Sequence, residues 1–349
     1  MSVVMLAGEI TGYGDADDVI DIVDVPKPEP KPGWVRIRVE ACGLNRLDVF
    51  ARIGHPEDDG QFPKRSGCDI TGVVDAVGES VDKSWVKKPV VVYPCLVCHN
   101  CEYCLSGEHT LCNSYQIIGE HISGGLAEYV VVPEWSLEER PPEIDPITAA
   151  AYPIAFTTAW RMIVTAGKLQ PSEKALILGA SGGVGNAALQ IANSIGAETY
   201  AMTSSANKID RLKDWASTVI HDPLYLFDTK IRNETDGRGV DLVVDHIGQK
   251  TWQQSIDSLA GGGRLVICGA TSGADATIDV RSVYQQHRQI IGAPMGNRRD
   301  FQQVTTHIAQ GKTTPVIDQV LPLESLSEAH KRIENGEVFG KIVIEISDG

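Results

Sequence analysis

The sequence predicts an α/β protein of two domains: a mainly β domain and a second domain built on a doubly wound parallel sheet. Three observations lead to this prediction. An apolar run at 175–178 enters a glycine-rich turn, and apolar residues at helical spacing follow it. Beyond the turn, strand and helix patterns alternate as far as residue 292, which is typical of βαβ units. Before residue 150, strand patterns follow one another with glycines and prolines between them, which favours a compact, partly open barrel.

The glycine-rich turn is the most informative feature of the second domain. A strand, a glycine turn and a helix in this order can hold a pyrophosphate on backbone N–H groups at the helix N-terminus. The dinucleotide fingerprint G-x-G-x-x-G is met at two of its three glycine positions, and Gly196 stands where the helix is expected to end. The alternative is a tight turn without a ligand. The candidate cofactor residues are Ala180, Ser181, Gly182, Gly183, Val184 and Gly185.

The other elements are predicted from the spacing of apolar residues. Alternating strands are expected over 35–40, 71–78 and 127–132 of the first domain. In the second half we expect a helix over 149–164, bent or interrupted at Pro153, strands at 199–202, 219–220, 241–245, 264–268 and 289–292, and helices over 206–215 and from residue 249.

The C-terminal residues are expected to rejoin the first domain. Ser325 and Glu328 form a capping-box pattern that predicts a helix start, and an alternating strand follows over 341–346. The first domain then comprises residues 1–150 and 293–349. The second, residues 151–292, is inserted between its two parts.

Four regularly spaced cysteines form the most specific pattern of the chain, Cys98-x2-Cys101-x2-Cys104-x7-Cys112. Four thiolates at this spacing can surround one ion tetrahedrally, and zinc is the expected metal. Such a site leaves no position for water, so its role would be structural. Iron–sulfur ligation and a loop of reduced cysteines are the alternatives. The neighbouring Cys95, His99 and His109 are interpreted as bystanders.

Composition and charge exclude several classes of function. The formal net charge of −15 over 349 residues argues against nucleic-acid binding, which needs basic patches. No apolar run is long enough to span a membrane, and the first nine residues lack the basic and apolar regions of a signal peptide. With five of eight cysteines between Cys95 and Cys112, we expect a cytoplasmic protein in a reducing compartment.

Together, the glycine turn, the cysteine lobe at 95–112 and the domain order resemble the medium-chain dehydrogenase/reductase superfamily over essentially the whole chain. In its zinc alcohol dehydrogenases such a lobe holds a structural zinc, and a second zinc is catalytic. The resemblance implies a GroES-like catalytic domain, a Rossmann domain and a nicotinamide-dependent oxidoreductase. It also implies a homodimer or homotetramer.

The sequence departs from that pattern at the ligand positions of the catalytic zinc. Asn45 stands where the first Cys ligand is expected, Cys68 and Asp69 replace a His-Glu pair, and the last ligand would fall at Ile154. A catalytic zinc needs about three good protein ligands and an open position. We therefore expect no catalytic zinc, with an atypical metal site at Cys68 and Asp69 as the alternative.

Segments 43–52 and 149–153 are similar instead to the zinc-free quinone and enoyl reductases of the superfamily. Segments 116–121 and 124–129 resemble a branch that keeps the structural zinc lobe and includes acryloyl-coenzyme A reductases. The resemblance implies hydride transfer from a reduced nicotinamide to an activated C=C bond of a small molecule, such as an enoyl thioester, an enone or a quinone. Quinone reductases often carry Tyr where Phe50 stands.

The expected cofactor is NADPH rather than NADH. An NAD site usually has an acidic residue about 20 residues after the loop, and residues 202–208 contain none. Ser204 and Ser205 can donate to a 2′-phosphate, and Lys208 or Arg211 can neutralise it. Lys341 matches a position that approaches the cofactor phosphates in relatives.

The roles of the remaining candidates follow from their chemistry. Asn45 can donate a hydrogen bond or orient the ribose, and His121 can supply a proton near neutral pH. Asp48 is expected to anchor a turn, and Arg46 and Arg52 to attract an acidic coenzyme A tail. Two other functions stay open: an NAD(P)-dependent zinc alcohol dehydrogenase and a non-catalytic NADPH-binding protein.

Overall fold

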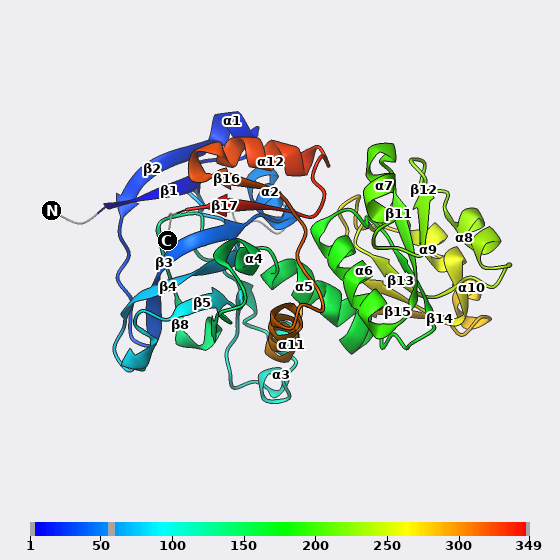
Figure 1. Cartoon of the computed structure of the whole chain (residues 1–349), viewed down its shortest axis with the longest axis horizontal. Coiled ribbons are helices and arrows are strands. Elements are labelled where there is room, and N and C mark those ends of the chain that lie inside the picture. The colour runs from blue at the N-terminus through cyan, green and yellow to red at the C-terminus, as the bar shows by residue number, and fades with distance from the viewer. Residues whose placement is uncertain (1–3, 55–59, 347–349) are drawn as a thin grey trace. The chain divides into compact units, whose positions relative to one another are not determined.

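The structure is a computed structural model that describes residues 4–54 and 60–346, so part of the N-terminal segment considered above lies outside it. The chain forms two compact units (Figure 1). The first unit holds Met1–Ile154 and Pro315–Gly349, and the second unit holds Ala155–Thr314. Insertion of one unit between two parts of the other follows the predicted arrangement.

The return to the first unit comes later than the predicted boundary at 292/293, because residues 293–314 lie in the second unit. Helix α11 (Arg298–Ala309) is held there by Asp300. The Asp300 carboxylate accepts a 2.6 Å hydrogen bond from Thr165 Oγ1 and lies 3.5 Å from Arg161 Nη1. Hydrogen bonds and ion pairs such as those of Asp300 leave no periodic pattern in the sequence. The spacing of apolar residues therefore does not predict that residues 293–314 belong to the second unit.

A seven-stranded sheet forms the centre of the first unit. The alternation that predicts strands at 35–40 and 71–78 reflects β3 and β4, which pair antiparallel, and apolar side chains such as Ile37 and Val74 fill the core. The predicted C-terminal strand is confirmed: β17 pairs with β3, so the red and blue segments run side by side in Figure 1. The strands are β3 (Trp34–Gly43), β4 (Asp69–Val77), β5 (Pro89–Val92), β8 (Tyr129–Pro133), β9 (Leu137–Glu139), β16 (Ile317–Pro322) and β17 (Lys341–Glu345).

Two small sheets and several short helices complete the first unit. An antiparallel hairpin of β1 (Val4–Ile10) and β2 (Ile20–Pro26) is followed by a proline-rich connection at residues 27–33. Strands β6 (Cys95–Leu96) and β7 (Gln116–Ile117) pair at the base of the cysteine lobe. The helices are α1 (Ala16–Val19), α2 (Arg46–Ile53), α3 (Glu102–Leu105), α4 (Pro146–Ala150) and α12 (Leu326–Glu334).

The predicted capping box at Ser325 is wrong. Helix α12 begins near the expected residue, but the Ser325 side chain makes no capping hydrogen bond. The reason is that a 3₁₀ turn over Leu323–Ser325 leads directly into α12, so the backbone at Ser325 is already turning (φ −91°, ψ 14°). A capping side chain needs an extended backbone before the first helical turn.

The second unit contains a six-stranded, fully parallel sheet in the order β12-β11-β10-β13-β14-β15. The chain builds outward from β10 on one side and then from β13 on the other, which confirms the doubly wound prediction. Buried residues such as Leu176, Tyr200 and Val243 form its core. The strands are β10 (Lys174–Ile177), β11 (Glu198–Thr203), β12 (Thr218–His221), β13 (Val240–Asp245), β14 (Leu259–Ile267) and β15 (Gln289–Gly292).

The helices of this region follow the predicted spacing with local differences. The helix expected over 149–164 is interrupted at Pro153 as predicted: α4 ends at Ala150, α5 (Pro153–Trp160) begins at the proline, and a π-helical segment, Arg161–Ala166, follows. The helix expected over 206–215 is a 3₁₀ turn at Ala206–Lys208 and the short α7 (Ile209–Leu212). The others are α6 (Gly183–Ile195), α8 (Asp228–Glu234), α9 (Trp252–Ser258) and α10 (Val280–Tyr284).

A search of the described residues for membrane-spanning helices finds none that is both long and apolar enough.

Candidate active site and metal centre

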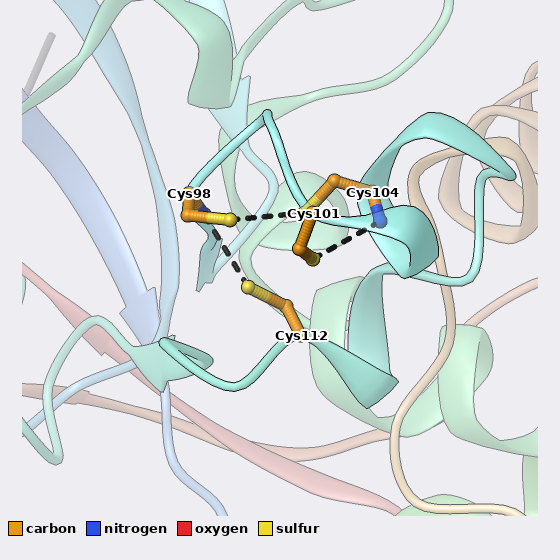
Figure 2. A group of neighbouring side chains, drawn as sticks. All are labelled: Cys98, Cys101, Cys104 and Cys112. Atoms are coloured by element: carbon orange, nitrogen blue, oxygen red, sulfur yellow. Dashed lines mark hydrogen bonds between the residues drawn. The ribbon is translucent and has the colours of Figure 1, made fainter.

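The structure brings the four cysteines of the lobe together. Their sulfur atoms all lie within 4.8 Å of one another and turn toward a common centre (Figure 2). Four sulfurs around a tetrahedral zinc would lie about 3.8 Å apart, given Zn–S bonds of about 2.3 Å. Cys98 Sγ and Cys104 Sγ are 3.9 Å apart. The donor set therefore fits one tetrahedral metal ion closed to water.

The backbone of the lobe also prepares its sulfurs for a cation. The N–H groups of Asn100 and Cys101 donate to Cys98 and lower the pKa of its thiol to about 6. Cys112 Sγ accepts from the N–H groups of Cys98 and Ser114, both at 3.4 Å. At Cys98 these donors favour the thiolate form, which is the form that binds a metal.

The three residues predicted to be bystanders make other contacts. The buried Cys95 thiol lies 3.2 Å from the Tyr115 hydroxyl, and burial raises its pKa to about 11. The rings of His99 and His109 lie edge-on to Trp135, with centroid distances of 4.5 and 5.3 Å. The metal-ligating cluster found among the described residues contains only the four predicted cysteines.

A second polar cluster lies at one end of the large sheet, where three strands meet. Asn45 follows β3, Asp69 begins β4 and Lys341 begins β17. The pairing of β3 with both other strands brings the three residues together, since Gly43 is the register partner of both Asp69 and Val343. A Cβ on Gly43 would lie 1.9 Å from the Ala150 carbonyl oxygen, so only glycine lets α4 cross β3 here. We call Asn45, Asp69 and Lys341 the lysine cluster.

The lysine cluster is closely bonded. Lys341 Nζ donates to Asn45 Oδ1 at 2.5 Å and lies 2.9 Å from Asp69 Oδ2. Asn45 Nδ2 also donates to Asp69 Oδ2, at 3.0 Å, and the Ile154 N–H donates to Asp69 Oδ1 at 2.7 Å. The side chains of Lys341 and Asp69 are 4% and 0% exposed. The result is a buried ion pair whose carboxylate has donors on both oxygens.

Two buried titratable groups, the Asp48 carboxyl and the Cys68 thiol, lie near this cluster. Asp48 accepts from the N–H groups of Asn45, at 2.7 Å, and Gly67, at 2.8 Å, so it anchors the turn as predicted. Burial nevertheless raises the pKa of Asp48 to about 6. Burial, and then the charges of Asp48 and Asp69, raise the pKa of the Cys68 thiol well above its usual range. With no cation bound beside it, Cys68 is therefore a thiol.

All four positions that match the catalytic zinc ligands therefore meet at the lysine cluster or next to it. Asp69 and Asn45 bond to the Lys341 ammonium, and Ile154 contributes only its backbone N–H. No sequence pattern pairs Lys341 with Asp69, because 272 residues separate them. The sequence did contain one signal: Asn45 and Ile154 stand at zinc-ligand positions but are poor zinc ligands. Without zinc, the negative charge of Asp69 requires a different cation as its partner.

The glycine turn of the second unit leaves the helix N-terminus open to a ligand. The turn closes through a 2.9 Å hydrogen bond from Gly182 N to the Gly179 carbonyl. Gly182 is the N-cap of α6 and has no side chain to cap the first N–H groups. A Cβ on Gly185 would lie 2.3 Å from the Gly179 oxygen, so the helix approaches the turn as closely as only glycine permits. This geometry fits a pyrophosphate cradle.

The end of the neighbouring strand β11 carries no acidic side chain, as predicted. Ser204 is exposed, Ser205 is half-buried and its N–H donates to Thr203 Oγ1 at 3.2 Å. Lys208 is 8% exposed, and Arg211 is exposed. Lys208 is therefore not part of a solvated helix face.

The remaining candidates have structural contacts. His121 Nδ1 accepts from the Ile117 N–H at 3.1 Å, and the side chain is 41% exposed. Arg46 donates to the carbonyls of Ile333 and Glu334 at the end of α12. Arg52 is 1% exposed and bonds to the Gly14 carbonyl and the Glu334 carboxylate. The expectation that Arg52 attracts a coenzyme A tail is wrong, because its guanidinium is buried and already paired.

Known proteins share this architecture over the whole chain. A family model described as "Alcohol dehydrogenase GroES-like domain" matches residues 31–142, and one described as "Zinc-binding dehydrogenase" matches residues 183–310. An NAD-dependent alcohol dehydrogenase of Sulfurisphaera tokodaii is 30% identical over 339 residues, 93% of this chain and 96% of that protein. An acryloyl-coenzyme A reductase of the same organism is 28% identical over 347 residues, 99% of this chain and 100% of that protein. Among solved structures, the crystal structure of an NAD-dependent alcohol dehydrogenase is 38% identical, covers 98% of this chain and 100% of that chain, and has a TM-score of 0.93. These matches confirm the predicted fold class, a GroES-like domain with a Rossmann domain.

Proposed function

Since the chain belongs to the medium-chain dehydrogenase/reductase superfamily of the zinc alcohol dehydrogenase type, and is an oxidoreductase, we propose that it is an NADPH-dependent reductase of activated C=C bonds. The reductase carries one structural zinc, on Cys98, Cys101, Cys104 and Cys112, and no catalytic zinc. One observation carries the proposal: the Lys341 ammonium donates hydrogen bonds to the side-chain oxygens of Asn45 and Asp69. The resemblance assigns both of these positions to ligands of the catalytic zinc.

The argument against a catalytic zinc is one of charge and ligand supply. A divalent ion beside Asp69 would have to displace or repel the buried Lys341 ammonium. Ile154 has no donor atom in its side chain, and the side-chain oxygens of Asn45 and Asp69 are bonded to the Lys341 ammonium. About three good protein ligands are needed, and the lysine cluster leaves fewer than that.

A site without a Lewis acid favours a substrate that is already activated. When bound, the reduced nicotinamide supplies a hydride, which adds to the β-carbon of a double bond conjugated to a carbonyl. The double-bond electrons then move to the carbonyl oxygen, and the α-carbon takes a proton from water or an acidic side chain. A fixed cation stabilises such developing negative charge, and Lys341 is a buried cation beside Asn45 and Asp69.

The other residues of the cluster have supporting roles in this proposal. Asn45 orients the ammonium through its carbonyl oxygen and ties Asp69 through its amide, at 2.5 and 3.0 Å. Asp48 holds the turn before α2. Because Nδ1 of His121 accepts from the Ile117 N–H, this ring is a neutral imidazole with its proton on Nε2, so it can offer a hydrogen bond through Nε2 but does not supply the proton.

The choice of NADPH rests on the end of β11. Ser204 and Ser205 can donate to a 2′-phosphate, and Lys208 can neutralise it, whereas a carboxylate that would repel it is missing from residues 202–208. The pyrophosphate would lie on the turn formed by Ala180, Ser181, Gly182, Gly183, Val184 and Gly185. The resemblance also makes Lys341 a candidate for binding a cofactor phosphate. Two of the three N–H groups of its ammonium bond to Asn45 and Asp69, and the third could bond to the phosphate.

The substrate is a small molecule, and we propose a coenzyme A thioester, an enone or a quinone. The acryloyl-coenzyme A reductase that matches 99% of this chain supports the thioester. We further propose a homodimer or homotetramer, since β15 forms an edge of its sheet and its Ile290 side chain is 40% exposed. The eight cysteines, none of which forms a disulfide, favour a reducing compartment such as the cytoplasm.

An alcohol dehydrogenase is the second candidate. The solved structure with 38% identity bears that description, and Cys68 and Asp69 would then have to bind a metal. A third candidate, a protein that binds NADPH without turnover, has no specific observation in its favour.

The test combines metal analysis with an activity screen. Protein of known zinc content is incubated with NADPH and acryloyl-CoA, crotonyl-CoA, a small enone or a quinone, and NADPH oxidation is followed. The same protein is tested for NAD⁺ and NADP⁺ reduction with primary and secondary alcohols. Oxidation with at least one C=C acceptor at one zinc per chain is expected. Alcohol oxidation with two zinc ions per chain would establish the dehydrogenase instead.

Turnover should depend on Lys341. The Lys341→Met variant is expected to lose roughly 100-fold in kcat, the effect of removing one charge-stabilising donor. Lys83→Met, which removes an exposed lysine from the same unit, should keep the wild-type rate. An unchanged kcat in Lys341→Met would remove Lys341 from the mechanism.

A further inference from the structure

His246 lies where the order of the parallel sheet reverses. Strands β10 and β13 are parallel neighbours at the centre of the sheet, and the chain continues from β10 to one side and from β13 to the other. Ligands of such sheets bind outside the carboxyl ends of the strands at this switch point. Gly179 follows β10 at that end, and His246 is the first residue after β13.

The His246 ring packs directly on the glycine turn. A Cβ placed on Gly179 would lie 2.6 Å from His246 Nε2 and 2.9 Å from Cε1, so the imidazole fills the space that a side chain at 179 would need. Gly179 has a left-handed backbone (φ +53°), and its carbonyl accepts the hydrogen bond from Gly182 that closes the turn. The imidazole therefore contacts the same turn that is proposed to hold the pyrophosphate.

The position of His246 is fixed from both sides. The buried Asp245 carboxylate accepts hydrogen bonds from Ile247 N, Gly248 N, Thr251 Oγ1 and Ser255 Oγ at 2.7, 3.1, 2.7 and 2.8 Å. The His246 carbonyl accepts from Thr271 Oγ1, on the segment after β14, at 3.2 Å. These bonds fix the backbone at His246, and the packing of the ring on Gly179 places the side chain, so the residue is preorganised as a binding residue requires.

We infer that His246 is a cofactor-positioning residue, which donates an imidazole N–H to a pyrophosphate oxygen of the bound nicotinamide dinucleotide. This inference rests on the proposed nicotinamide cofactor but not on the proposed reaction. The glycine turn supplies backbone N–H donors, and the adjacent imidazole adds a side-chain donor at the same edge. The sequence alone does not indicate His246, because it stands 67 positions after Gly179 and only the parallel pairing of β10 with β13 brings the two together.

The test measures binding, without any acceptor substrate. His246→Phe keeps a ring on Gly179 but removes both nitrogens, and His246→Asn keeps a hydrogen-bond donor. His287→Asn, at an exposed histidine of the same unit with φ +52°, is the matched control. Dissociation constants are measured for NADPH, for 2′-phospho-ADP-ribose, which contains the pyrophosphate, and for 2′-AMP, which lacks it.

His246→Phe is expected to weaken NADPH and 2′-phospho-ADP-ribose each by about tenfold, the usual value of a hydrogen bond to a charged group, and to leave 2′-AMP within about twofold. His246→Asn should recover most of the affinity, and His287→Asn should match the wild type. Wild-type affinity of His246→Phe for the two pyrophosphate ligands would overturn the inference. Equal weakening of 2′-AMP would also overturn it, since this would indicate a general loss of structure.

The outcome is independent of the reductase proposal. If no C=C acceptor is reduced but NADPH binds, the reductase proposal fails and the inference about His246 is still decided by the same titrations. If the chain binds NADH instead of NADPH, the titrations use NADH, ADP-ribose and adenosine.

Discussion

The ammonium of Lys341 and the carboxylate of Asp69 form a buried ion pair, with 2.9 Å between Nζ and Oδ2. Asn45 bonds to both partners. Asp69 and Asn45 stand at positions that the resemblance assigns to ligands of a catalytic zinc, and we propose that the Lys341 ammonium supplies the positive charge there instead. A metal ion accepts additional ligands from the substrate, whereas an ammonium offers only hydrogen bonds and charge.

Removing the cation alone should destabilise the first unit. We predict that Lys341→Met lowers the free energy of unfolding by about 3 kcal/mol, because it leaves the Asp69 carboxylate buried without a charge partner. The double variant Lys341→Met/Asp69→Asn should recover a large part of that loss. Urea unfolding of the wild type, both single variants and the double variant gives the coupling energy. Additive effects of the two substitutions would contradict a direct interaction.

The glycine turn should tolerate a methyl group at Gly182 but not at Gly185. We predict that Gly185→Ala destabilises the protein by about 2–3 kcal/mol, since its Cβ would meet the Gly179 carbonyl oxygen at 2.3 Å. Gly182→Ala is the control, because the same oxygen would lie 3.4 Å away at ordinary contact distance. Thermal unfolding of the ligand-free variants distinguishes them, and equal melting temperatures would show that the turn is looser than described.

His330 should make the protein sensitive to acid. It is 0% exposed, its ring nitrogens have no hydrogen-bond partner among the described residues, and burial, with the nearby Arg52 charge, lowers its pKa to about 3. An unfolded histidine has a pKa of about 6.5, so the unfolded chain takes up the proton first. The contribution of His330 to stability is therefore present above about pH 6.5 and is lost as the pH falls toward 3.

At about pH 5 this loss amounts to about 2 kcal/mol. We predict that His330→Leu removes it, so the difference in unfolding free energy between wild type and variant changes by that amount between about pH 7 and pH 5. The exposed His287→Asn should show no such change. A difference that stays constant with pH would mean that His330 is protonated in the folded protein.

The cysteine lobe should lose its metal when one ligand is removed. We predict that Cys112→Ser abolishes the single zinc ion and lowers the melting temperature, because the lobe depends on four sulfurs around one centre. Cys95→Ser is the matched control: Cys95 is buried nearby but bonds to Tyr115. Loss of zinc from Cys95→Ser, or retention of a full equivalent by Cys112→Ser, would mean that the ligand set is different.

Features that depend on nearby residues could be predicted from the sequence. The strand, turn and helix around the glycine turn, and the four cysteines that span 15 positions, are local patterns with a direct geometric meaning. The end of α6 at Gly196 is of the same kind, since the residue adopts the left-handed conformation (φ 91°) that glycine favours.

Features that depend on distant pairings could not be predicted. Lys341 meets Asp69 only because β17 and β4 both pair with β3, and His246 meets Gly179 only because β13 lies beside β10. Arg52 reads as a surface charge in the sequence, yet a carboxylate 282 positions away lets it be buried.

We propose that an ammonium has replaced the catalytic metal, and the zinc content of the purified wild-type chain is the decisive measurement. The protein is saturated with zinc, freed of loosely bound ions by gel filtration and analysed by mass spectrometry for zinc per chain. We predict one zinc ion per chain, held by the cysteine lobe. Two tightly bound zinc ions per chain, with the second lost on Asp69→Asn, would contradict it.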